Sequence, residues 1–257
     1  YLMDDEQTKI IGMYLEDVKD GHLFTENLKK AVAKKPVLIV KSGRTQAGAR
    51  ATVSHTASLA VEDAVFDGVI RQAGAIRLIG IDDFILTLTG FLNMPLPKGD
   101  RLAFVTYSGA QAIMSIDAAV EHGLQVARLE ETTQARIAGV IATPSKTRNP
   151  IDIFPDWLAH GYEKTMSEIL KALLDDQEVD GIVFISFADA TPEVYQPMVD
   201  ILKGERRKPV FFSLLGDNKE KEACESFLNG NGLPCYDFPE YAVRVFAHMR
   251  QYARIKE

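Results

Sequence analysis

The chain of 257 residues is poor in cysteine, with only Cys224 and Cys235, and it has no run of eighteen apolar residues. The two cysteines lack the spacing of metal or redox motifs. We therefore interpret them as ordinary buried or half-buried thiols in a reducing, cytoplasmic compartment. Without a long apolar run the sequence predicts no membrane-spanning helix, and it shows no secretory signal.

An excess of basic charge is also lacking. The chain has 29 Lys and Arg residues against 36 Asp and Glu residues, a net charge of -7 and a pI of about 5.4. Sequence-independent nucleic-acid binding and attachment to an anionic membrane both need a basic face, so the charge balance argues against both classes. Hydrophobic residues make up 46% of the chain, which is enough for a sizeable core.

Apolar, strand-like runs alternate with amphipathic, helix-like segments along the chain. The predicted strands are residues 9–16, 36–41, 76–80, 101–107, 125–130, 181–187, 209–215 and 234–238. The predicted helices are residues 22–34, 61–74, 81–93, 110–123, 132–141, 162–176, 193–204, 218–229 and a last one that starts at Pro239. This alternation predicts an α/β fold with parallel sheets that helices cover on both faces.

A break and a repeat divide the pattern into two domains. The segment "MPLPKGD" (94–100) interrupts it with two prolines and a glycine. The stretches "KKPVLIVKSG" (34–43) and "RKPVFFSLLG" (207–216) resemble each other. We therefore expect two related flavodoxin-like domains, residues 1–94 with about three strands and residues 95–257 with about five strands.

The start of the chain differs from a complete domain. The stretch "YLMDDEQTK" reads as the tail of a helix, and about three strands are too few to cover their own faces. We therefore expect the first domain to be incomplete at its N-terminus, in a fragment of a longer chain.

Sites in parallel sheets lie beyond the carboxyl ends of strands, and three candidates lie there. They are Glu16, the loop 42–58 with His55, and the turn "YSGAQ" (107–111). The turn opens a helix near Ser108, where free N–H groups and the helix dipole suit a phosphate. An ordinary tight turn between a strand and a helix fits the same residues.

His55 lies in a loop made mainly of Gly, Ala, Ser and Thr. An imidazole can act as a general base, a metal ligand or a nucleophile, but no second ligand stands at metal spacing, so no metal is expected. An accessible nucleophile that carries phosphate and a histidine that caps the next helix both stay open. Glu16 ends the neighbouring predicted strand and is placed to orient His55, with a solvated carboxylate as the alternative.

Four stretches, "YLEDVKDG", "KKPVLIVKSGRTQAGARATVSHTASLA", "IRQAGAIRL" and "NPIDI", together resemble the superfamily of NDP-forming acyl-CoA synthetases. The chain is most similar to the ADP-forming acetyl-CoA synthetase branch, which is related to succinyl-CoA synthetase. The resemblance extends over essentially all 257 residues. Its most specific part is the string from "KSGR" to "SHT", and the rest is supportive.

The resemblance implies roles for five residues. His55 would be phosphorylated, Glu16 would hold it, and Ser108, Gly109 and Ala110 would form a phosphate cradle. The implied reaction converts acyl-CoA, phosphate and ADP or GDP into the acid, CoA and ATP or GTP, with His55 relaying the phosphoryl group. The chain departs from the family where Ala110 replaces the second glycine of a Gly-Gly pair, and where Ala57 and Val61 replace glycines beside the histidine.

The sequence contains no Gly-rich CoA-binding domain and no ATP-grasp domain. The resemblance therefore implies these two parts as partners, with CoA, ADP or ATP and Mg bound in the complete enzyme and none bound by this fragment alone. We expect the isolated chain to be inactive and to form an oligomer. The alternatives are a non-catalytic sensing or assembly module, like those fused to protein acetyltransferases, and a plain nucleotide- or flavin-binding domain. The retained Glu16 and His55 favour the enzyme, and the role of the "NPID" loop (149–152) stays open.

Overall fold

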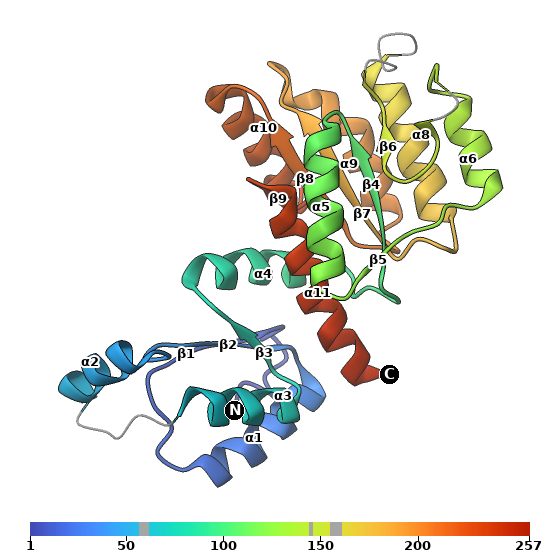
Figure 1. Cartoon of the computed structure of the whole chain (residues 1–257). Helices are drawn as coiled ribbons and strands as arrows, with labels where there is room; N and C mark the ends of the chain where they lie inside the picture. The colour runs from blue at the N-terminus through green and yellow to red at the C-terminus, as the bar shows by residue number, and fades with distance from the viewer. Residues whose placement is uncertain (57–61, 144–145, 155–160) are drawn as a thin grey trace. The chain divides into compact units, whose positions relative to one another are not determined.

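The computed structural model describes residues 1–56, 62–143, 146–154 and 161–257, and it describes residues 52–56 by their backbone alone. The chain forms two compact units (Figure 1), one made of Tyr1–Leu92 with Gln251–Glu257 and the other of Asn93–Arg250. Every strand pair in both sheets is parallel, which confirms the predicted α/β fold class. None of the helices formed by the described residues has both the length and the apolar character that a membrane crossing needs.

The first unit is built on a sheet whose described strands follow the order β1-β2-β3. Its elements are β1 (Ile11–Leu15), α1 (Gly21–Lys34), β2 (Val37–Lys41), α2 (Gln46–Thr56), α3 (Asp63–Ala73), β3 (Ile76–Leu78) and α4 (Ile81–Asn93). Helices α1 and α3 lie together on one face of the sheet, and α4 lies on the other (Figure 1). The middle strand β2 is buried throughout, as its apolar sequence predicts.

Local sequence signals set the ends of the helices in this unit. Asp20 caps α1, because its Oδ1 accepts a hydrogen bond from the Leu23 N–H at 2.9 Å. Gly74 ends α3 in the left-handed region at φ 79°, a conformation that a side chain would disfavour. Between these ends, Leu28 and Val32 bury one stripe of α1, and each contributes roughly 1.5–3 kcal/mol by leaving water.

The sequence predicts a loop at 42–58, and this prediction is wrong for most of the segment, because residues 46–56 form helix α2. Its first turn is capped by Thr45, whose Oγ1 accepts a hydrogen bond from the Gly48 N–H at 3.1 Å. Three alanines in the first two turns add the highest intrinsic helix propensity of any residue type. The small residues that indicated a loop are therefore helix-forming behind a threonine cap.

The predicted second domain included the chain's C-terminus, but residues 251–257 belong to the first unit. There, Tyr252 donates a hydrogen bond from its hydroxyl to the Val32 carbonyl at 3.3 Å, and Lys256 donates to the Ala33 carbonyl. Ile255 lies against Gly74, where an added Cβ would come within 2.9 Å of the Ile255 Cδ1. The end of the last helix is thus fixed by the carbonyls of α1, a contact that periodicity alone does not show.

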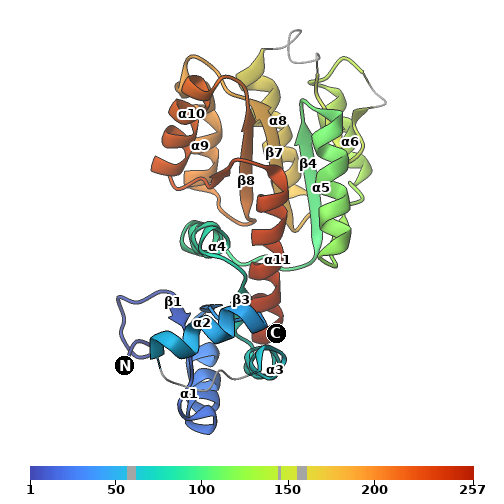
Figure 2. The same cartoon turned by 60° about the vertical axis from the view of Figure 1, so that its left-hand side comes forward.

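The second unit is built on a sheet with strand order β5-β4-β7-β8-β9, and the additional strand β6 pairs with β4. Its elements are β4 (Arg101–Thr106), α5 (Gly109–Glu121), β5 (Gln125–Val126), α6 (Glu131–Ala138), β6 (Ile151–Asp152), α8 (Tyr162–Asp175), β7 (Gly181–Phe187), the 3-10 helix η2 (Pro192–Tyr195), α9 (Gln196–Gly204), β8 (Val210–Leu215), α10 (Asn218–Gly230), β9 (Cys235–Tyr236) and α11 (Pro239–Lys256). Helix α5 lies on one face of this sheet, and α8 and α9 lie on the opposite face (Figure 2).

The start of β7 leaves room for one aromatic ring of α11. A Cβ added to Gly181 would lie 2.2 Å from the Phe246 Cε2, and Phe246 is fully buried. Glycine is therefore required here by space, since the ring occupies the volume that any side chain would need.

The "NPID" segment, whose role the sequence leaves open, completes the outer side of β4. Strand β5 pairs with β4 at Arg101–Leu102, and β6 pairs with it at Val105–Thr106. Between these two pairings lies the side chain of Asn149. Its Oδ1 accepts from the Phe104 N–H at 2.9 Å, and its Nδ2 donates to the carbonyls of Leu102 at 2.8 Å and Ala127 at 3.0 Å. The Asn149 carboxamide therefore takes the place of a peptide group along the part of β4 that lies between its pairings with β5 and β6.

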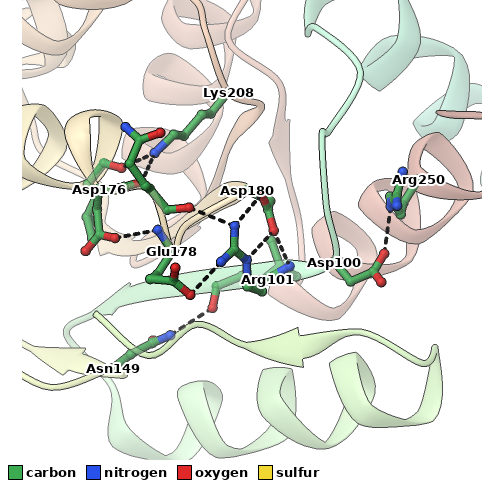
Figure 3. Close-up of polar contacts among 11 residues, drawn as sticks. Asp100, Arg101, Asn149, Asp176, Glu178, Asp180, Lys208 and Arg250 are labelled. Carbon is green, nitrogen blue, oxygen red and sulfur yellow. Dashed lines mark hydrogen bonds and ion pairs between the residues drawn. The ribbon is translucent and has the colours of Figure 1, made fainter. Parts of the chain in front are cut away.

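Ion pairs fill the amino edge of the second sheet (Figure 3). The Asp180 carboxylate accepts from the Arg101 backbone N–H at 3.0 Å and from its Nε at 2.7 Å, and Arg101 Nη1 lies 2.6 Å from the Glu178 Oε2. The Asp180 hydrogen bond raises the pKa of Arg101 further above its ordinary value. Beside them, Lys208 donates to the carbonyls of Leu173 at 2.8 Å and of Asp176. These contacts anchor the starts of β4 and β7.

Because the Asn149 carboxamide bridges backbone groups, we expect its replacement to lower the stability of the protein strongly. Asn149→Ala removes the partner of the Phe104 N–H and of the Ala127 carbonyl, while the Leu102 carbonyl keeps its bond from the Ala127 N–H. Each buried group that loses its partner costs about 1–3 kcal/mol. We expect the free energy of unfolding, measured by urea titration, to fall by at least about 2 kcal/mol. As a matched control, Asn27→Ala removes an exposed amide that bonds only within α1 and should cost less than about 0.5 kcal/mol. Equal effects of the two variants would contradict the bridging role.

The amino edge also predicts a pH dependence, because burial lowers the pKa of Lys208 to about 8. An unfolded lysine has a pKa of about 10.4, so between these values the unfolded chain binds more protons than the folded chain. The contribution of this group to stability therefore rises as the pH increases from about 8 to about 10.4. Urea titrations at several pH values should show this rise in the wild type and in Lys219→Met, and lose it in Lys208→Met. A rise that persists in Lys208→Met would assign it to other groups.

Candidate active site

Glu16 lies directly after β1, at the carboxyl edge of the first sheet, and is half-buried. The register pairs Leu15 of β1 with Lys41 of β2, and the Ser42 N–H donates to the Leu15 carbonyl at 3.0 Å. Glu16 therefore follows the strand that pairs with β2, as the sequence predicts.

His55 lies in the last turn of α2, but its imidazole is outside the part of the chain that the structure describes. The predicted pairing of Glu16 with His55 therefore stays a prediction. Ala57 and Val61, which replace family glycines, also lie outside the described residues. Within the first unit, the end of β1 and the entrance to α2 share one edge, which is where the pairing requires them.

The turn from β4 into α5 has the open form that an anion site needs. Ser108 is the N-cap residue with an extended backbone, φ -128° and ψ 105°, and its side chain makes no capping hydrogen bond. Gly109 and Ala110 are exposed, and no described residue accepts a hydrogen bond from their N–H groups. These donors carry the positive end of the helix dipole. Nothing lies within 4 Å of a Cβ added to Gly109, so the space in front of the turn is open.

Thr106 holds this turn, a contact that sequence reasoning missed. The threonine is fully buried at the end of β4. Its hydroxyl accepts from the Ser108 N–H at 2.9 Å and donates to the Ser108 carbonyl at 2.8 Å. A threonine two residues before a predicted N-cap was the available signal, but the same spacing occurs in many turns without this contact.

An aromatic cluster lies behind the turn. The ring of Tyr107 stacks on Tyr162 with 6.0 Å between centroids and meets the edge of Phe187 at 5.6 Å. The Tyr162 hydroxyl lies 2.8 Å from the Ser186 Oγ, and the Tyr195 hydroxyl donates to the Phe187 carbonyl at 2.6 Å. Burial raises the pKa of Tyr162 and Tyr195, so both phenols stay protonated at neutral pH and support the turn by packing.

The two halves of the predicted site belong to different units. Glu16 and α2 are part of the first unit, and the turn at Ser108–Ala110 is part of the second. Each half is therefore described within its own unit, and the site that would join them stays a prediction. Among the described residues, no group of three His, Cys, Asp or Glu side chains is arranged to hold a metal ion.

Comparison with known proteins agrees with this architecture. Residues 1–91 match the family described as succinyl-CoA ligase like flavodoxin domain. The chain is 34% identical over 255 residues to the ADP-forming acetate–CoA ligase II of Archaeoglobus fulgidus, an alignment that covers 99% of this chain and 37% of that protein. It is 32% identical to the alpha subunit of the ADP-forming acetate–CoA ligase II of Pyrococcus furiosus, covering 98% of this chain and 55% of the subunit.

The structure is similar to that of a Ca. Korarchaeum cryptofilum protein described as a dinucleotide-forming acetyl-coenzyme A synthetase 1 in complex with phosphate and ADP. The TM-score is 0.89 at 28% identity, over 98% of this chain and 55% of that chain. This chain thus spans about half, or less, of the length of the relatives that it matches.

Parallel flavodoxin-like units with this match define a protein of the succinyl-CoA-ligase-like class. Within that class, the chain belongs to the superfamily of NDP-forming acyl-CoA synthetases, as its relatives of at least 30% identity are ADP-forming acyl-CoA ligases. The family predicted from the sequence motifs is confirmed.

The open turn predicts that one backbone N–H controls anion binding. Gly109→Pro removes the N–H of the first residue of α5, a position that tolerates proline, and the extended Ser108 suits a residue before proline. We expect this variant to fold with a stability within about 1 kcal/mol of the wild type and to lose at least about tenfold in affinity for inorganic phosphate. Phosphate binding is followed by phosphorus NMR titration. Gly109→Ala keeps the N–H and should bind phosphate as the wild type does. Equal phosphate affinity in all three proteins would show that this turn is not the phosphate site.

Proposed function

We propose that this chain is the phosphohistidine-carrying core of an NDP-forming acyl-CoA synthetase. The observation that carries the proposal is the α5 turn without a side-chain cap, where the N–H groups of Gly109 and Ala110 have no acceptor among the described residues. It is supported by alignment of 98% of the chain with an alpha subunit of an ADP-forming acetate–CoA ligase. An anion-binding helix start is what a phosphoryl relay needs, because charge accumulates on the transferred group.

In the proposed reaction, phosphate attacks the thioester carbonyl of the acyl-CoA. The carbon–sulfur bond breaks, which gives an acyl phosphate and CoA. The His55 imidazole then attacks the phosphorus atom, the bond between phosphorus and the acyl oxygen breaks, and the carboxylate leaves. Phosphohistidine finally transfers the phosphoryl group to ADP or GDP. The nitrogen nucleophile divides one transfer between distant substrates into two shorter ones.

The proposal also assigns roles to Gly109, Ala110 and Glu16. The N–H groups of Gly109 and Ala110 hydrogen-bond the phosphoryl oxygens, and the dipole of α5 stabilises their charge. Glu16 accepts a hydrogen bond from one ring nitrogen of His55, which fixes the tautomer and keeps the other nitrogen nucleophilic. A carboxylate in this position also stabilises the cationic ring of the phosphohistidine.

In this proposal, CoA, the nucleotide and Mg²⁺ are bound by a CoA-binding part and an ATP-grasp part of the complete enzyme. The chain therefore contributes the phosphoryl carrier and its cradle, in an oligomeric assembly with those parts. Without them we expect no turnover of acyl-CoA.

The test is phosphorylation of His55 in the complete enzyme. Incubation with γ-labelled ATP should label this chain, and the label should survive alkali and be lost in mild acid, as a phosphorus–nitrogen bond requires. His55→Ala should abolish labelling, while His22→Ala, which alters an exposed histidine on α1, should leave it unchanged. Glu16→Gln should reduce the labelling rate by about 10- to 100-fold, as the loss of an orienting partner does elsewhere.

The controls separate the proposal from its alternatives. The chain without its partner parts should show neither labelling nor turnover with acetyl-CoA, phosphate and ADP. Normal labelling of His55→Ala, or an alkali-labile label on Ser54 or Thr56, would refute the relay. A complete protein that binds acyl-CoA but is never labelled would be a sensing module instead.

A further inference from the structure

The hydroxyl of Thr106 makes both of its hydrogen bonds to one residue. It accepts from the Ser108 N–H at 2.9 Å and donates to the Ser108 carbonyl oxygen at 2.8 Å. The Ser108 carbonyl also accepts from the Ala112 N–H at 3.0 Å, which is the first helical bond of α5. One buried hydroxyl therefore fixes the two peptide groups that flank Ser108, and it leaves the next two N–H groups unused.

Thr106 itself is held on both sides by neighbouring strands. It pairs with Ile185 of β7 and with Asp152 of β6, and its carbonyl accepts from the Ile153 N–H at 3.0 Å. Its side chain is fully buried. The hydroxyl is thus a rigid reference point of the sheet, and the start of α5 takes its orientation from it.

The orientation of Ser108 also decides whether its own side chain caps α5. Serine is among the residue types preferred at an N-cap, where its hydroxyl usually accepts from the N–H of the second or third helical residue. Here the side chain makes no such bond, although Ser108 occupies the N-cap. If the backbone of Ser108 could rotate, its own hydroxyl would compete for the N–H groups that a phosphate needs. The contacts of Thr106 oppose that rotation.

We propose that Thr106 is the positioning residue of the phosphate cradle, and that its hydroxyl keeps Ser108 from capping α5 so that Gly109 and Ala110 stay free for phosphate. The inference rests on the proposed function, in which this turn binds phosphate. Thr106 acts through Ser108 and touches no substrate. Its role requires a hydroxyl at this place rather than a side chain of a given volume.

The test compares Thr106→Val, which keeps the volume without the hydroxyl, with Thr106→Ser, which keeps the hydroxyl. Phosphorus NMR titration of this chain should give a dissociation constant for inorganic phosphate at least about tenfold higher for Thr106→Val, and within about twofold of wild type for Thr106→Ser. In the complete enzyme, Thr106→Val should raise the KM for phosphate more than it lowers kcat. Thr133→Val, at another buried threonine of the same unit, should change neither.

Amide spectra of the unmutated chain give a readout that does not depend on how a variant folds. The Ser108 N–H should be protected from hydrogen exchange and should shift little on adding phosphate, while the N–H signals of Gly109 and Ala110 should shift. Exposure of the Ser108 N–H, or wild-type affinity in Thr106→Val, would overturn the inference while labelling of His55 still supports the relay. Loss of phosphate affinity in Thr106→Val without any labelling of His55 would instead keep the positioning role and refute the relay.

Discussion

The second unit depends on the three hydrogen bonds that Asn149 makes to the outer side of β4. Strands β5 and β6 pair with opposite ends of β4, and between them the Phe104 N–H of β4 has the Asn149 carboxamide as its partner. Because β4 is fixed along its whole length, its last residue, Thr106, can orient the turn that follows. A chain of direct contacts thus connects an asparagine in a loop to the free N–H groups at the start of α5.

The two edges of the second sheet differ in whether their polar groups have partners within the protein. At the amino edge, the Arg101 guanidinium pairs with carboxylates and the Lys208 ammonium donates to backbone carbonyls, so the charged groups of this edge have partners within the protein (Figure 3). At the carboxyl edge, the α5 turn keeps its donors free, and the groups behind it are phenols that burial holds neutral. A neutral, packed support beneath these donors favours an external anion, because no carboxylate in the part of the chain that the structure describes accepts a hydrogen bond from them.

The alternation of strands and helices could be predicted because buried parallel strands such as β2 are nearly continuous apolar runs. The family was also readable, since its motif string lies in one continuous stretch. Helix α2 was missed because Gly, Ala, Ser and Thr were weighed as loop formers, although Thr45 supplies a cap and alanine favours helix. Asn149 and Thr106 could not be assigned, because their roles come from partners that only the folded sheet brings near. The pairing of Glu16 with His55 stays a prediction.

The contact between Gly181 and Phe246 limits how this protein can diverge. A side chain at position 181 and the full ring at position 246 cannot coexist, since the two would occupy the same volume. Either substitution alone creates an overpacked or a hollow site, at a cost of a few kcal/mol, which is a large part of a domain's net stability. Sequences related to this one should therefore vary at the two positions together, and a glycine lost at the start of β7 should be accompanied by a smaller residue in α11.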